Sequence, residues 1–89
     1  MLKRVSYLSY KNGDMNLAIK YFMQWSEISN SYVPHLYMSY CYENLYKETQ
    51  KNKFLEKAVK EAKLAKLISG NEDKDIEKQL DDLKDYIDL

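Results

Sequence analysis

Residues 11–22, KNGDMNLAIKYF, place a tight turn directly before an amphipathic helix. Gly13 can take the positive φ that ends one helix. Asp14 can accept hydrogen bonds from the free amides at the start of the next helix. Ala18 and Phe22 lie four residues apart and begin its apolar face. The stretch therefore predicts two helices joined by a short turn.

Similar signals predict an all-α chain of about five helices. We expect helices over about 2–10, 15–28, 34–46, 53–69 and 72–88. Pro34 suits the first turn of the third helix. Gly70 can end the fourth helix, and Asn71 can cap the fifth. Residues 47–52 are polar, so we expect either a loop or a loosely wound extension of the third helix there.

Helical spacing also predicts which sides of the helices are buried. Leu2, Val5 and Leu8 recur every three residues and give the first helix an apolar side. The second and fourth helices have broader apolar sides. The fifth has a narrow stripe, formed by Ile76, Leu80, Leu83 and Ile87.

Length and charge limit the classes of function. With 89 residues the chain has room for one domain. Residues 1–66 carry 11 basic and 6 acidic side chains, and residues 67–89 carry 3 and 8, so the net charge is zero. This dipolar pattern gives no reason to expect nucleic acid or a membrane as partner, and the lysines of residues 47–66 are interpreted as a solvated helix face.

Compartment follows from the cysteine count and the apolar runs. Cys41 is the single cysteine, so neither an internal disulfide nor a cysteine-rich zinc site is expected. The first ten residues have a basic pair without a long apolar core after it, and no run of about 18 apolar residues occurs, so we expect neither a signal peptide nor a membrane span. We therefore expect a cytoplasmic protein.

The first four helices can be aligned as two hairpins. For the first helix of each hairpin, Leu2-x2-Val5-Ser6-x2-Ser9 matches Tyr37-x2-Tyr40-Cys41-x2-Asn44. For the second, Ala18-x3-Phe22-x2-Trp25 matches Ala58-x3-Ala62-x2-Ala65. This pattern resembles the tetratricopeptide repeat family, whose period of about 34 residues is close to the spacing of the first helices. The second helices are spaced more widely, which predicts a longer turn near residues 47–52.

The resemblance implies a short, right-handed array of stacked antiparallel helical hairpins. Repeat one would span 2–31, repeat two 33–70 and a capping helix 72–88. Asn30 and Gly70 stand where the family usually has the proline that closes a repeat. Such arrays act as scaffolds for protein–protein interaction and peptide binding, which makes an interaction module the expected function.

The family register would place a tyrosine-rich groove on the first helix of each repeat. The implied partner-binding residues are Lys3, Tyr7, Tyr10, Lys11, His35, Met38, Tyr42 and Tyr46. Tyrosine offers a large apolar ring with a hydroxyl, and lysine can receive a carboxylate. Three alternatives remain open: half-buried packing without a ligand, self-association through the same face, and a sensory segment of a larger regulator.

Catalysis, metals and cofactors have little support in the sequence. His35 is the only histidine, and there is no glycine-rich phosphate loop or nucleophile motif. The acidic stretch that starts at Asn71 has the spacing of a calcium-binding loop at four positions, but Ile76 replaces the glycine of its sharp turn. We therefore expect no enzyme activity, no metal and no cofactor.

Overall fold

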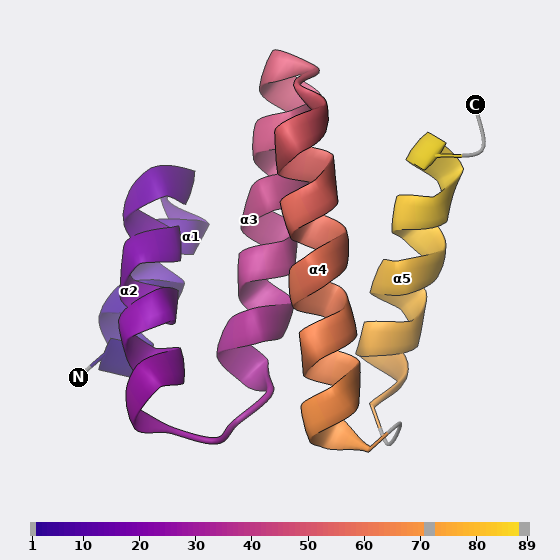
Figure 1. Ribbon diagram of the computed structural model, residues 1–89. Helices are drawn as coiled ribbons and strands as arrows, with labels where there is room; N and C mark the ends of the chain where they lie inside the picture. The colour runs from indigo at the N-terminus through magenta and orange to yellow at the C-terminus, as the bar shows by residue number, and fades with distance from the viewer. Residues whose placement is uncertain (1, 71–72, 88–89) are drawn as a thin grey trace.

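The computed structural model describes residues 2–70 and 73–87, which are all-α. The helices are α1 (Leu2–Lys11), α2 (Met15–Ile28), α3 (Val33–Thr49), α4 (Asn52–Ser69) and α5 (Lys74–Ile87). Each helix packs against the next one in the chain, and α5 also reaches α3. In Figure 1, α3 and α4 stand side by side at the centre, α2 lies to the left with α1 behind it, and α5 lies to the right. The predicted all-α class, with five helices in the described residues, is confirmed.

The turn between α1 and α2 has the predicted geometry. Gly13 adopts φ 87°, which a side chain would strain. The Asp14 carboxylate accepts a hydrogen bond from the Leu17 amide at 3.1 Å, so it satisfies one of the free donors at the start of α2. The backbone of Asp14 in turn donates to the Ser9 carbonyl at 3.0 Å, which ties the turn to α1.

The connection between α3 and α4 is shorter than predicted. Helix α3 continues to Thr49, and only Gln50 and Lys51 separate it from α4. Gln50 takes the left-handed conformation, with φ 59°, and its backbone N–H donates to the Tyr46 carbonyl at 2.7 Å. The longer turn expected near residues 47–52 is therefore wrong, and the alternative of a helical extension is correct. Residues 47–49 therefore belong to α3, because a left-handed Gln50 reverses the chain without a loop.

The core lies mainly between α2, α3 and α4. Its buried apolar residues include Ala18, Phe22, Trp25, Met38, Cys41, Leu45, Leu55, Ala58 and Ala62. The alanines are fully buried, so the helix backbones can approach closely where they cross. A smaller cluster of Leu36, Ala65 and Ile76 joins α5 to α3 and α4. Ile76 and Leu83 of the predicted α5 stripe are buried and Leu80 is half-buried, whereas Ile87 is exposed.

The buried side of α1 differs from the prediction. Ser6 and Ser9 are the buried residues of this helix, whereas Val5 is 38% and Leu8 48% exposed. Small serines allow α1 to lie close to α2, and the Ser6 hydroxyl donates to the Leu2 carbonyl at 2.6 Å, so its burial leaves no donor unpaired. The expected apolar side formed by Val5 and Leu8 thus points away from the core.

Helix α5 begins with a capping interaction from Asp73. Its carboxylate accepts a hydrogen bond from the Asp75 amide at 2.8 Å. The predicted cap at Asn71 lies outside the described residues. Among the five helices of the described ranges, none combines the length and apolarity needed to cross a bilayer.

Candidate binding surface

A buried serine sets the register of α3. The Ser39 hydroxyl is fully buried and donates to the Ala58 carbonyl of α4 at 2.7 Å, so α3 and α4 lie close together at this point. Ser6 is the fully buried serine of α1, and we align it with Ser39; Cys41 is fully buried as well but is not a serine. The expected alignment instead matched Ser6 with Cys41. It was shifted by two residues, which corresponds to a rotation of about 200° around the helix.

This shift explains why three predicted groove residues on α3 lie elsewhere. Met38 is 2% exposed and belongs to the main core. Tyr42 is buried, its ring stacks 6.5 Å from that of Phe54 on α4, and Lys57 covers it. His35 Nδ1 lies 2.7 Å from Glu61 Oε1 on α4. Helix α4 therefore covers the side of α3 on which His35, Met38 and Tyr42 lie, so these predicted groove residues are buried or half-buried against it.

Tyr46 contacts α5 rather than α1. It is half-buried, and its ring meets that of Tyr86 edge-on at 5.3 Å. The Tyr86 hydroxyl donates to Glu43 Oε2 at 2.8 Å, and Gln79 donates to Glu43 Oε1 and to the Ser39 hydroxyl, both at 3.1 Å. This hydrogen-bonded group fixes α5 on α3, so Tyr46 belongs to an internal junction.

Two of the predicted residues of α1, Lys3 and Tyr7, lie against Trp25 of α2. Tyr7 is 37% exposed and touches three other rings, with centroid distances of 5.9 Å to Phe22, 5.8 Å to Trp25 and 5.0 Å to Tyr37. Lys3 is exposed, with its ammonium 5.5 Å from the centre of the Trp25 ring. Lys11 is exposed at the other end of the helix.

Four tyrosines connect α1 to α3, and we call them the tyrosine cluster: Tyr7, Tyr10, Tyr37 and Tyr40. The Tyr10 ring lies 5.5 Å from Tyr37 and 6.4 Å from Tyr40, and Tyr37 meets Tyr40 edge-on at 5.4 Å. The cluster is partly open to solvent, since Tyr7 is exposed and the other three are only half-buried. It therefore presents aromatic surface from two helices that are separated in sequence.

The electrostatic surroundings differ between the two ends of the cluster. Burial raises the pKa of Tyr40 to about 12, and the nearby Asp75 carboxylate of α5 acts on that pKa in the same direction. Burial also raises the pKa of Tyr7 and of Tyr10. These phenols stay protonated at neutral pH and can donate hydrogen bonds. Lys3 supplies a positive charge at the α1 end, and Asp75 supplies a negative charge at the α5 end.

Sequence reasoning missed Tyr37 and Tyr40 as members of this surface. When Ser6 is aligned with Ser39, Tyr7 corresponds to Tyr40, and Lys3 and Lys11 correspond to Leu36 and Asn44. Ser39 was the available signal, because it is a small residue near one family period after Ser6. The expected alignment instead matched Ser6 with Cys41, which lies between Tyr40 and Tyr42.

Cys41 is fully buried, and burial raises the pKa of its thiol to about 12. In the ranges 2–70 and 73–87, no three His, Cys, Asp or Glu side chains gather closely enough to hold a metal ion.

Comparison with protein-family models, curated proteins and solved structures finds no match to this chain. The helix arrangement and the tyrosine cluster are the features from which function is inferred below.

Proposed function

We propose that this chain is a tetratricopeptide-like interaction module that binds a peptide segment of another protein at the tyrosine cluster. Two hairpins, α1–α2 and α3–α4, followed by one further helix support an arrangement of two repeats and a capping helix. In such an array the first helix of each hairpin forms the binding face. Helices α1 and α3 contribute the tyrosine cluster to that face.

The contact between Tyr10 and Tyr40 carries this proposal. Their rings lie 6.4 Å apart although the two residues belong to different hairpins, and both remain half-buried. Ring faces that are held by neighbouring rings lose little conformational entropy when a ligand covers them. The hydroxyls can bond to a peptide backbone, while Lys3 and Asp75 offer opposite charges for orienting it.

Selection from a displayed library of random peptides tests the proposal. We expect the wild-type chain to enrich peptides whose affinity falls at least about tenfold in Tyr40→Ala, because central aromatic contacts dominate such interfaces. Tyr40→Phe keeps the ring and is expected to retain most of the binding. Tyr21→Ala, on α2, is the matched control. Failure to enrich any peptide, or equal binding by Tyr40→Ala and wild type, would contradict the proposal.

Self-association is the second candidate, and the exposed Val5 and Leu8 on α1 favour it. These residues leave an apolar strip on the first helix without a covering element among the described residues. Tyr42 cannot contribute to such an interface because it is buried. Light scattering over a concentration series would show a dimer that Val5→Lys/Leu8→Lys disrupts. A monomer at every concentration would exclude this candidate.

A further inference from the structure

Four hollows follow α4 along its length; two of them also reach α5, and two are lined by α4 and Gly70 alone. Hollows of about 580, 410 and 170 Å³ all include Val59 in their lining, and a fourth of about 380 Å³ shares Lys63 and Leu67 with the second. Because neighbouring hollows share residues, they form one surface. It extends from Asn52, at the start of α4, to Gly70, directly after its end. We call it the lysine-edged groove.

The floor of this groove is apolar. Val59 and Leu64 of α4 and Leu80 of α5 are half-buried and line it. Leu67 is 79% exposed, more than any other large apolar residue among those described. Leu67 thus places a large apolar side chain in solvent beside the half-buried Val59 and Leu64.

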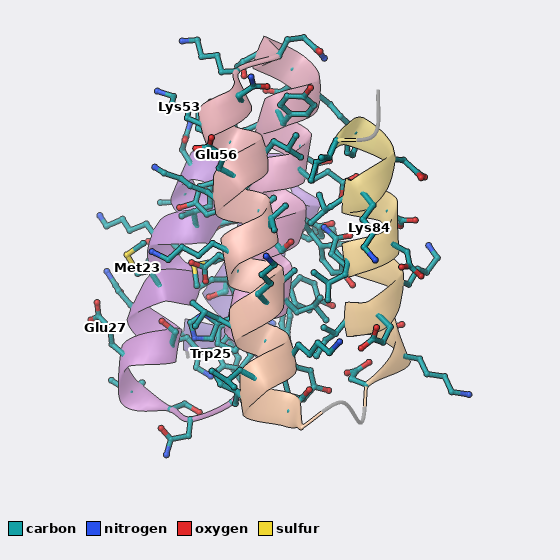
Figure 2. The ribbon with its side chains drawn as sticks, turned by 45° about the vertical axis from the view of Figure 1, so that its right-hand side comes forward. Met23, Trp25, Glu27, Lys53, Glu56 and Lys84 are labelled. Atoms are coloured by element: carbon teal, nitrogen blue, oxygen red, sulfur yellow. The ribbon has the colours of Figure 1, made fainter. Side chains whose placement is uncertain are left out.

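The edges of the groove are basic. Lys60, Lys63, Lys66 and Lys84 line it, against Glu56 as the acidic lining residue. Lys66 is paired with Glu77 at 3.1 Å, and Lys84 lies 3.9 Å from Asp81. Lys60 and Lys63 have no carboxylate within 4.0 Å in the part of the chain that the structure describes. Figure 2 looks onto this side and shows Glu56 on α4 and Lys84 on the neighbouring α5.

Shape and charge together select one kind of occupant. Helix α4 has 18 residues and is therefore about 27 Å long, which gives room for about five turns of another helix packed along α4, with α5 beside it at the hollows that contain Leu80 and Tyr86. Such a helix needs an apolar stripe for Val59, Leu67 and Leu80, flanked by carboxylates for the lysines. We propose that the lysine-edged groove binds an acidic amphipathic helix of another protein.

Charge argues against the obvious occupant from a second copy of this chain. The exposed apolar strip on α1, Val5 and Leu8, lies among Lys3, Arg4 and Lys11 and has no acidic residue in its helix. Docking α1 of a copy into the groove would bring lysines and an arginine against Lys60 and Lys63. Like charges at an interface oppose association, so the acidic helix of a different protein fits better.

A pair of designed helical peptides tests this proposal with the full chain. Both peptides have the same leucine stripe and about five helical turns, and they differ only in carrying glutamate or lysine beside the stripe. We expect the glutamate peptide to bind and the lysine peptide not to bind, as measured by fluorescence anisotropy. Rising salt should weaken the binding, because exposed charges at the rim contribute to it.

Variants of exposed groove residues locate the site. Lys60→Glu/Lys63→Glu should weaken the glutamate peptide by at least about tenfold and strengthen the lysine peptide, because it reverses two rim charges. Leu67→Glu should weaken the glutamate peptide, because it replaces an apolar contact with a like charge. Lys20→Glu, an exposed lysine on α2, is the control and should leave binding unchanged, with folding checked by circular dichroism.

Three outcomes would overturn the proposal. The first is no binding of the glutamate peptide, and the second is equal binding of both peptides or equal loss in Lys20→Glu. The third is that vesicles of phosphatidylserine bind the chain through Lys60 and Lys63 while neither peptide does, which would assign the groove to an anionic lipid surface. None of these measurements depends on the tyrosine cluster, so they can fail while the function proposed above survives.

Discussion

Helices α1 and α3 occupy equivalent places in their hairpins, yet the same positions are exposed in one and buried in the other. When Ser6 is aligned with Ser39, Val5 corresponds to Met38 and Leu8 to Cys41. Val5 and Leu8 are 38% and 48% exposed, whereas Met38 and Cys41 are core residues. Helix α1 packs mainly on α2, but α3 lies between α2 and α4. The number of neighbouring helices, and not the apolar spacing, decides which side of a helix is buried.

Thiol chemistry offers the largest expected difference between these two helices. Native Cys41 should react with a thiol reagent at least about a thousand times more slowly than a cysteine placed at Leu8 in a Cys41→Ala chain, because its exposure requires unfolding that costs several kcal/mol. Its raised pKa also leaves less thiolate at neutral pH. The measurement is the rate of labelling followed by absorbance.

Denaturant supplies the control for this comparison. In concentrated guanidinium the two cysteines should react at similar rates, since neither is covered. Comparable labelling rates under native conditions would contradict the burial of α3 between two helices.

Truncation of the two equivalent apolar residues is expected to give the next largest effect. Met38→Ala should lower the free energy of unfolding by about 2–5 kcal/mol, because it removes a fully packed side chain and leaves a cavity. Val5→Ala should change it by no more than about 0.5 kcal/mol, because its side chain is partly solvated. Urea unfolding monitored by circular dichroism measures both.

A conservative variant keeps this test usable if Met38→Ala does not fold. Met38→Leu preserves most of the volume and should cost less than about 1.5 kcal/mol. Equal costs for the truncations at Met38 and Val5 would mean that α1 is covered as fully as α3.

The two buried serines provide the smallest expected difference. Ser39→Ala should cost about 1 kcal/mol, because it removes a hydrogen bond to the Ala58 carbonyl and one from Gln79. Ser6→Ala should be close to neutral, since its hydroxyl bonds only within its own helix, to Leu2, and alanine favours the helix. Chemical unfolding resolves the difference, and a larger cost at Ser6 would argue against the register that equates the two positions.

Much of the fold could be predicted from local chemistry. Gly13 and Asp14 specified the first turn, and Gly70 adopts the left-handed conformation, with φ 72°, that ends α4. The bounds of α2 agree with the predicted 15–28, and those of α4 differ by one residue at the start. These features depend on residues within a few positions of one another, so no tertiary contact was needed to foresee them.

The candidate surface was harder to predict because it depends on rotation around a helix axis. A shift of two residues in α3 exchanged Tyr40 for Tyr42 as the predicted surface residue. Because both positions are tyrosine, the residue pattern did not reveal the shift. Gln50 likewise gave no signal for a tight reversal, since a left-handed conformation is uncommon outside glycine and asparagine.

The sequence by itself determined five helices, the places where the chain turns and the small residues that let helices cross. Tertiary structure alone decided that Ser39 marks the crossing of α3, that Tyr7 and Tyr10 meet Tyr37 and Tyr40, and that the lysines of α4 border an apolar groove. The physical reason is that caps and turns are local, whereas the side of a helix that becomes buried depends on which other helices lie against it.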